Sequence, residues 1–455
     1  MATPVNNSAE MAAAAEKSQH DIDDAEFNSP ASSAASLNEK PPPPWTWKLV
    51  AVILVTLVRF GGSWSSGITG AMKTTLKKQL KINNTQYALL EASEDFMTTV
   101  LILASGLLTD RLGGAELMVA KLGAFTGTST ANIIAVNTGD FAWVFWVAVF
   151  INFFTNICSA VFFWFNKKSS KKFGHSVDPV TGEKLIKKGK KLDIHKVLEV
   201  PWVFWVLMLY SLCYTSTAVV FSGNATELAE QRFDIDSVTA GWYTALVRYA
   251  GFFIVPFIGI LIDFIANEPR SVVASSLGIF ISMALVNWAP TVSGTAAAFG
   301  VYAVLTSYNP TVLIDGMRAS LWQQSTFGTA YSLKIMMNNS INIVVRIVAG
   351  VIQDADNNSY DRVVVLYVAM AALSVVVSCV IIFLAWRSPD LRHLQWTRKQ
   401  RMDQAVMLAN RKERFLGEKA TRNALISKVC FCLLMVLLLG GWASYIWGAI
   451  TGHNS

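Results

Sequence analysis

The chain of 455 residues is 53% hydrophobic and only 15% charged, with a mean hydropathy of +0.40. Soluble domains carry about 25% charged residues, so this composition excludes an ordinary soluble protein and places the chain in a lipid bilayer. The formal net charge of +7 is concentrated in two segments, which indicates membrane topology rather than a surface that binds nucleic acid.

The first 44 residues are rich in Ala, Ser, Asn and acidic residues and end in "PPPP", which predicts a disordered tail rather than a signal peptide. Eleven apolar segments follow. A helix needs roughly 20 apolar residues to cross the hydrocarbon layer, so we predict an all-α polytopic membrane protein. The predicted spans are 46–69, 87–109, 115–136, 141–165, 200–222, 239–264, 271–290, 294–316, 328–352, 363–386 and 427–450.

Two strongly basic links set the predicted orientation. Residues 166–199 follow the fourth span and residues 389–426 follow the tenth, and six crossings separate them. Cytoplasmic loops carry an excess of Lys and Arg, so both links and the N-terminal tail are expected to be cytoplasmic. The loop from Met72 to Gln86 violates this rule, because it is basic but falls on the far side of the membrane.

Glycosylation sequons agree with this topology. Asn83, Asn224 and Asn357 begin N-x-S/T sequences that fall in predicted far-side loops, and we expect them to be glycosylated. Asn338 lies inside a predicted helix and Asn6 in the cytoplasmic tail, so these two are expected to stay unmodified.

The second span ends in "GLLTDRLGG", which places Gly106, Asp110, Arg111 and Gly113 at the spacing G-x-x-x-D-R-x-G. Glycine permits a tight turn, and the aspartate can cap a neighbouring helix or pair with a basic residue, which would hold one transporter conformation. The sequence "GILIDF", which includes Asp263, echoes this motif in the second half of the chain. Repetition of this kind predicts a two-half transporter with conformational gating at these residues.

Charged residues inside the spans are expected to face a cavity or one another, because they are costly in lipid. Such a set supplies cations for the carboxylate of a peptide-like zwitterion and anions for its amine, and the amides of "MMNN" could add contacts. An internal ion pair, such as Arg59 with Asp95, is the structural alternative. The predicted substrate-binding residues are Arg59, Glu91, Glu94, Asp95, Lys121, Arg248, Lys334, Asn338, Asn339 and Arg346.

Two stretches narrow the family. Residues 120–156, beginning "AKLGAFTGTSTANII", and residues 327–368, beginning "FGTAYSLKIMMNNS", resemble the fungal branch of the lysosomal dipeptide uniporters. This family is known as major facilitator superfamily domain-containing protein 1. The resemblance covers most of residues 45–390 and implies the major facilitator superfamily fold, with six helices in each half.

Membership of this family would imply export of dipeptides, especially those with Lys, Arg or His, from the lysosome or vacuole to the cytosol. It would also imply alternating access without obligatory proton coupling. Family members form homodimers and associate with a glycosylated lumenal protein, so both are candidate partners here. By the same resemblance, Lys121 takes the place of a basic residue that contacts substrate on the family's fifth helix.

The chain departs from the family in length. About 50 residues separate Gly113 from the basic link, where the family has four helices and this chain has room for two. We therefore expect an incomplete N-terminal half (45–165), a complete six-helix half (200–388) and one extra crossing (427–455), about 11 membrane helices in all. The join falls near Gly114, and a simple anchor is the favoured role of the extra crossing.

These patterns predict a secondary transporter in a lysosomal or vacuolar membrane, with the plasma membrane as the alternative site. A transport-incompetent variant, a binding subunit or a carrier of another small solute are the alternative functions. The sequence contains no nucleophile–base set, metal-ligand cluster or phosphate-binding loop. We therefore expect no enzyme activity, no cofactor, no metal and no nucleic-acid partner.

Overall fold

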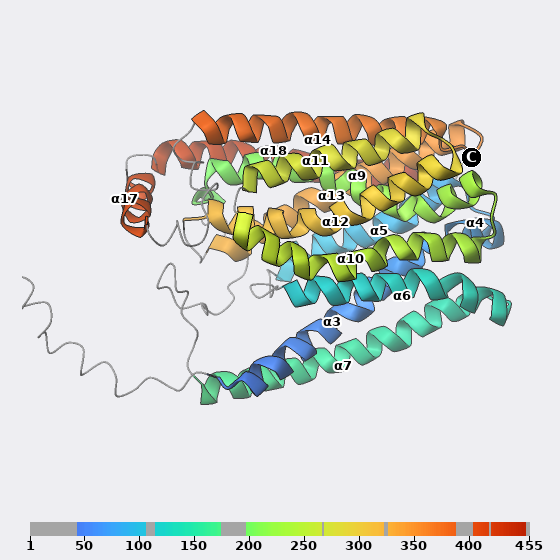
Figure 1. The fold of residues 1–455 in the computed structure, drawn as a ribbon, viewed down its shortest axis with the longest axis horizontal. Coiled ribbons are helices and arrows are strands. Elements are labelled where there is room, and N and C mark those ends of the chain that lie inside the picture. Colours follow the sequence, from blue (N-terminus) through green and yellow to red (C-terminus); the bar gives the residue numbers. More distant parts are fainter. Residues whose placement is uncertain are drawn as a thin grey trace, which may run out of the picture.

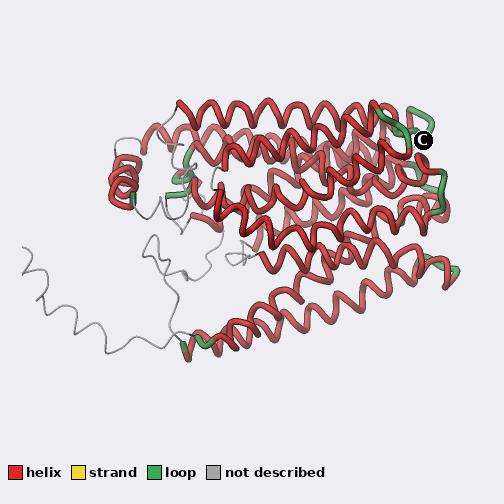
Figure 2. The backbone as a smooth tube through the Cα atoms, viewed as in Figure 1, coloured by secondary structure: helices red, strands yellow, loops and turns green. Residues whose placement is uncertain are grey.

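A computed structural model of the chain describes residues 43–105, 114–173, 197–265, 268–322, 326–387, 404–417 and 420–451. Within these ranges the chain is helical and contains no strand (Figures 1 and 2). The long helices run along a common axis, and the short helix α17 lies at one end of the bundle (Figure 1).

The structure describes thirteen helices in chain order. The first five are α3 (Trp45–Ala71), α4 (Lys73–Leu80), α5 (Asn84–Ser105), α6 (Gly114–Thr138) and α7 (Ala142–Lys172). The next six are α9 (Trp202–Phe233), α10 (Ser237–Ile265), α11 (Glu268–Trp288), α12 (Val292–Ser320), α13 (Phe327–Ala355) and α14 (Asp361–Arg387). The last two are α17 (Ala405–Leu416) and α18 (Ala420–Thr451).

Eight of these helices are long and apolar enough to cross a membrane: α3, α7, α9, α11, α12, α13, α14 and α18. The other three expected spans are also helices, α5, α6 and α10, and they lie in the same bundle (Figure 1). Three acidic residues lower the hydropathy of α5, and many Gly, Thr and Ser residues lower that of α6. The all-α architecture predicted from the sequence is therefore confirmed.

Two predicted loop regions are helical instead. Helix α9 continues to Phe233, so the expectation that Asn224 lies in a loop is wrong. Its last turns contain Ala, Leu, Glu and Gln, which are good helix formers, and Asp234 then ends the helix in a left-handed conformation. The far-side segment after α3 forms the short helix α4, which Lys81 ends in the same way.

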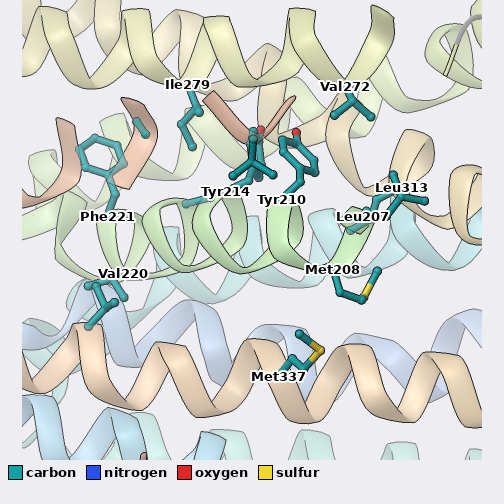
Figure 3. Close-up of a cluster of buried hydrophobic side chains, with 14 of the residues drawn as sticks. Leu207, Met208, Tyr210, Tyr214, Val220, Phe221, Val272, Ile279, Leu313 and Met337 are labelled. Atoms are coloured by element: carbon teal, nitrogen blue, oxygen red, sulfur yellow. The ribbon is translucent and has the colours of Figure 1, made fainter. Parts of the chain in front are cut away.

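Helix α9 forms the core of the C-terminal half. Its buried side chains include Tyr210, Tyr214 and Phe221, which pack against residues of α11, α12 and α14 (Figure 3). The two tyrosine hydroxyls are satisfied, because Tyr210 donates to Asn309 Oδ1 at 2.6 Å and Tyr214 donates to the Leu305 carbonyl at 3.0 Å. Aromatic side chains of this size supply much of the burial that holds the half together.

The contacts between the halves identify the position of α6. Helix α5, the second long helix of the N-terminal half, packs on α13, the fifth helix of the C-terminal half. Helix α6 packs on α10, the second helix of the C-terminal half. If a pseudo-two-fold axis relates the two halves, the contact of α5 with the fifth C-terminal helix implies a reciprocal contact of α10 with the fifth helix of the N-terminal half. Helix α6 thus occupies a fifth-helix position, and α11 and α12 have no counterparts among the described N-terminal residues.

Close backbone contact joins α3 to α6. A Cβ atom at Gly67 would lie 2.5 Å from the carbonyl oxygen of Ala124, and one at Gly127 would lie 2.2 Å from the carbonyl oxygen of Trp64. Small residues allow membrane helices to approach this closely, and the approach gives van der Waals contact where hydrophobic burial drives little association. The small-residue composition of α6 is therefore explained by its packing.

The extra helix α18 packs against both halves, which a simple anchor would not do. Gly441 and Gly448 lie against Ser340 and Ile347 of α13, and Gly448 also lies against Leu89 of α5. On α5, Phe96 stacks with Tyr445 at a centroid separation of 5.1 Å. Helix α18 therefore spans the contact between α5 and α13.

Candidate functional site

We call the interface between α3–α7 and α9–α14 the seam, and the charged side chains along it form the candidate site. The first group joins α5 to α13. Arg346 pairs with Glu91 and with Asp95, whose Oδ2 lies 3.1 Å from Arg346 Nε. The three side chains are 8–15% exposed, so this is a buried ion-pair cluster. Removing one partner from such a cluster leaves an uncompensated charge.

The other two charged residues of this region lie apart from the cluster. Asp95 pairs with Arg346, whereas the sequence offered Arg59 as its alternative partner. The Arg59 side chain on α3 is exposed. Glu94 is also exposed, and its carboxylate accepts a hydrogen bond from the Ser66 hydroxyl at 3.3 Å. Glu91 and Asp95 lie one turn apart on α5, so both carboxylates reach Arg346.

The second group consists of cations on α6 and α10. Lys121 crosses onto α10, where a Cβ atom at Gly251 would lie 3.3 Å from its Cδ, and its Nζ donates to the Thr306 carbonyl at 3.4 Å. Arg248, one turn before Gly251, donates to the Ser222 hydroxyl at 2.7 Å. Within the described part of the chain, neither cation forms an ion pair with a carboxylate.

Lys334 is a third half-buried cation, on α13, and its Nζ lies 5.3 Å from the centroid of the Tyr331 ring. It too lacks a carboxylate partner among the described side chains. Nearby on the same helix, the buried amide of Asn338 hydrogen-bonds the Ser211 hydroxyl at 3.2 Å, and Asn339 is half-buried.

A short stretch of α9 lies between the two groups. Ser222 contacts Arg248, while a Cβ atom at Gly223 would lie 2.9 Å from Glu91 Oε1 and 3.3 Å from Arg346 Nη1. Only a glycine leaves room for both charged side chains at that point. The cationic group and the acidic group thus contact neighbouring residues of α9, Ser222 and Gly223. We call them the cationic pole and the acidic pole of the site.

A small pocket opens beside Arg248. Helices of both halves line it, with Gly70 and Thr128 on one side and Phe221, Arg248 and Tyr302 on the other. The pocket has room for about one water molecule, so in this conformation a peptide does not fit there. Arg248 therefore faces a closed space between the halves.

The third group was not identified from the sequence. Lys73 at the start of α4 is 3% exposed, and its Nζ donates to Asn224 Oδ1 at 2.6 Å, Gln353 Oε1 at 2.8 Å and Tyr360 Oη at 2.9 Å. Glu227 Oε2 lies 2.9 Å from the same Nζ. We call Asn224, Glu227, Gln353 and Tyr360 the far-end socket, and all four belong to the C-terminal half.

Burial affects the protonation of two members of this group that lie outside the long helices. Burial lowers the pKa of Lys73, and the nearby carboxylate of Glu227 opposes that change. Burial raises the pKa of the Tyr360 hydroxyl well above its usual range, so the hydroxyl keeps its proton. The hydroxyl donates to Glu227 Oε2 at 2.5 Å.

Lys77 makes a second connection at this end of the bundle. Its Nζ donates to Glu227 Oε1 at 2.8 Å and to Asn84 Oδ1 at 2.5 Å. Asp354 on α13 accepts from the backbone N–H groups of Asn84 and Thr85 at 2.9 and 2.8 Å. A carboxylate in this place satisfies the free donors at the start of α5 and suits the helix dipole. Lys73, Lys77 and Asp354 together close the seam at this end.

The clue to this group was the basic loop that violated the topology rule. Lys73 and Lys77 lie in that loop, and the structure pairs both with Glu227. A free lysine disfavours placement of its loop on the far side of the membrane. A lysine whose charge is paired inside the protein does so less. The violation therefore marked a buried contact between lysines and a carboxylate that lies far from them in the sequence.

The structure describes the remaining predicted residues unevenly. Gly106, Asp110, Arg111 and Gly113 lie outside the described residues, and Asp263 lies on α10 with its side chain outside the description. The gating prediction at these positions therefore stays a prediction.

The three predicted glycosylation sites differ in accessibility. Asn224 is 7% exposed and binds Lys73, so it is not open to modification in this conformation. Asn83 is half-buried, with its Oδ1 accepting from the Gln86 N–H at 2.7 Å. Asn357 is exposed in a left-handed conformation with φ of 52°. Of the three, Asn357 is the most accessible to a glycosylating enzyme.

Residues 117–314, from early α6 into α12, match the family model of the Major Facilitator Superfamily. The match supports a major facilitator superfamily transporter. It begins just after the join near Gly114. Together with the paired helices of the seam, it supports a major facilitator fold in which α11 and α12 have no counterparts among the described N-terminal residues. No curated protein sequence matches the chain.

Solved structures of bacterial transporters are similar at low identity. One is a bacterial homologue of the human lysosomal transporter Spinster, inward-facing and unoccupied, at 11% identity over 90% of this chain and 99% of that chain, with a TM-score of 0.44. Another is a bacterial homologue of the iron transporter ferroportin, outward-facing with soaked iron, at 13% identity over 75% of this chain and 99% of that chain, with a TM-score of 0.45. Neither likeness assigns a substrate to this chain.

Proposed function

We propose that this chain is a secondary transporter that carries small peptides across its membrane by alternating access. The observation that carries the proposal is the pair Lys121 and Arg248, two half-buried cations at the seam without carboxylate partners in the described part of the chain. Buried charges are costly unless compensated, and a substrate carboxylate would compensate them. The acidic pole at Glu91 and Asp95 lies across α9 and suits a substrate amine.

Arg346 occupies the acidic pole in the present conformation. A substrate amine would compete with this guanidinium for the same two carboxylates. Binding would then weaken the contact between α5 and α13, which belongs to the seam. A ligand changes a conformational equilibrium only through such differential contacts, so this exchange offers a route from binding to movement of the halves.

The finer features of the proposal rest on the family resemblance. It favours uniport of dipeptides containing Lys, Arg or His out of a lysosome or vacuole, with the N-terminus in the cytoplasm. It also favours a homodimer and a glycosylated lumenal partner.

Counterflow of lysyl-alanine and alanyl-alanine in proteoliposomes tests the proposal. The variants Lys121→Ala and Arg248→Ala should raise KM for both dipeptides at least tenfold, because a hydrogen bond to a charged group contributes about 1.5–3 kcal/mol. The matched control is Lys48→Ala, which removes an exposed lysine at the start of α3 and should leave KM unchanged. Absence of counterflow for every dipeptide, or equal KM values in all variants, would refute the proposal.

The missing helices support a second candidate function, a chain that binds solutes without transporting them. Helices α11 and α12 have no counterparts among the described N-terminal residues, and a transporter half without them would have an incomplete cavity wall. Dipeptide binding without counterflow would favour this candidate. Transcript sequencing would then be informative, since an insertion of about 60–80 residues after Gly114 would supply two helices and their loops.

A further inference from the structure

The far-end socket is built like a receptor for an ammonium group. Lys73 Nζ has three N–H donors, and four oxygen atoms of the socket surround it at 2.6–2.9 Å. The rings of Tyr360 and Tyr87 lie 5.2 and 5.5 Å from the same nitrogen, within the range of a cation–π contact. The group that fills this receptor in the present conformation is a side chain of the protein itself.

The socket holds its shape through contacts that do not involve Lys73. Glu227 Oε2 accepts from the Tyr360 hydroxyl at 2.5 Å and from Gln353 Nε2 at 3.1 Å. Asn224 Nδ2 donates to the Tyr367 hydroxyl at 2.8 Å, which directs its Oδ1 toward the ammonium. The four acceptors are thus preorganised, and a preorganised site loses little free energy when it takes up a ligand.

The ligand and the receptor belong to different halves. Lys73 and Lys77 both lie on α4, whereas the socket residues lie on α9, on α13 and just before α14. When the halves separate at this end, both lysines leave with α4, and Glu227 loses both of its cations. An exposed carboxylate would remain, with two amide oxygens and a phenol oriented for an ammonium.

We propose that the far-end socket is a binding site for the ammonium group of a cationic solute, and that Lys73 occupies it as an internal ligand while this end is closed. The inference deepens the proposed function and rests on it for the view that the solute is a peptide with a lysine side chain. The incoming ammonium and Lys73 compete for one site, so the socket favours cationic solutes and an occupied socket delays closure.

Chemical rescue of Lys73→Ala tests the site without any transport assay. The variant empties the socket, and n-propylammonium should bind there. The purified variant should show a saturable rise in Tm of about 2 °C or more, because a ligand that binds only the folded state stabilises it. Sodium chloride at equal ionic strength and n-propanol serve as controls, and neither should produce the rise.

Two further proteins serve as negative controls for this test. The wild-type chain, whose socket holds Lys73, and the double variant Lys73→Ala/Glu227→Gln should both be insensitive to n-propylammonium. An equal rise in all three proteins, or no rise in Lys73→Ala, would overturn the proposal.

A second measurement applies if Lys73→Ala does not fold. In proteoliposomes, Glu227→Gln should lower the ratio of kcat/KM for lysyl-alanine to that for alanyl-alanine about tenfold, since one charge-assisted contact is lost. Lys77→Met weakens the closure but keeps the carboxylate, so its ratio should match the wild type. An unchanged ratio in Glu227→Gln would contradict the proposed binding site. An equal fall of the ratio in Lys77→Met would show that Glu227 only holds this end closed and does not bind the solute.

Asp361→Asn is the matched control for the loss of a carboxylate. Asp361 lies at the same end of the bundle, is 79% exposed and pairs with Arg232 at 3.3 Å outside the socket. Its variant should keep the wild-type ratio. If wild-type proteoliposomes carry no dipeptide, the proposed function fails, while the Tm titration still decides whether the socket binds ammonium.

Discussion

Helices α3 and α9 are equivalent in the two halves, since each begins its half, yet their surroundings differ. In the apolar 18-residue stretch of α9, 72% of the residues are buried. In the corresponding stretch of α3, only 11% of the residues are buried. Helix α9 is covered by α10, α12, α13 and α14, and α3 is covered mainly by α6 and α7. The difference teaches that the C-terminal half holds itself together by burial, while the described part of the N-terminal half depends on close backbone contact and on partners across the seam.

Helix α5 is the clearest example of such dependence. It packs on α13 and α18 and is joined to α13 by the buried cluster around Arg346. At its N-terminus, Asp354 of α13 satisfies its free backbone donors. Within the described residues, the second helix of the N-terminal half is therefore held largely by the C-terminal half.

The largest expected effect is the loss of Arg346. Arg346→Ala leaves Glu91 and Asp95 buried without their cation, which should cost about 3–5 kcal/mol and lower the Tm of the purified protein strongly. The triple variant Glu91→Gln/Asp95→Asn/Arg346→Gln should recover much of that loss, because no charge is stranded.

The control for this prediction is Arg362→Ala, since Arg362 is 72% exposed in its pair with Asp356. It should change the Tm little, as surface pairs contribute little. Equal Tm values for Arg346→Ala and Arg362→Ala would show that α5 does not depend on the cluster.

A smaller effect should separate the two halves by their glycines. Gly127→Ala places a Cβ 2.2 Å from the backbone oxygen of Trp64 and should cost about 1–3 kcal/mol, because a backbone cannot move aside cheaply. Gly278→Ala in the C-terminal half meets only the end of the Leu305 side chain, which can rotate, so it should lower the Tm less.

Gly62→Ala is the matched control on α3, where nothing lies within 4 Å of the added Cβ. Tm measurements on the three variants would rank them, with Gly127→Ala the lowest. Equal losses at Gly127 and Gly278 would remove the contrast between the halves.

The smallest effect is expected at α18. Tyr445→Leu keeps apolar volume but removes the stack on Phe96, which should cost about 0.5–1.5 kcal/mol and lower the Tm slightly. Trp447→Leu, at an exposed position on the same helix, is the control. If both variants match the wild type, α18 does not support α5 through this stack.

The sequence was sufficient to predict the eleven long helices, because eight are strongly apolar runs of bilayer length and α5, α6 and α10 are mainly apolar runs of similar length. It also predicted the join near Gly114, since only two helices fit between Gly113 and the basic link, and the structure forms two there, α6 and α7. Helix ends were less predictable. The turns around Asn224 are polar, so they resemble a loop until their burial against α4 is known.

The site could be predicted only in part. Charge inside a span indicated Glu91, Asp95, Lys121, Arg248 and Arg346, and the structure brings all five to the seam. The pairing could not be predicted, because the partners lie on helices far apart in sequence. Hydropathy cannot distinguish a cation with an acidic partner from one without, and that distinction separates Arg346 from Lys121.

The contact between Lys73 and Gln353 has a consequence for biosynthesis, because the two residues are 280 positions apart in the chain. At a synthesis rate of 5–20 residues per second, Lys73 emerges roughly 15–55 s before Gln353 exists. During that interval the lysine has none of the socket residues Gln353 and Tyr360 to bind. Closure of this end therefore cannot occur before the ribosome has delivered α13 and Tyr360.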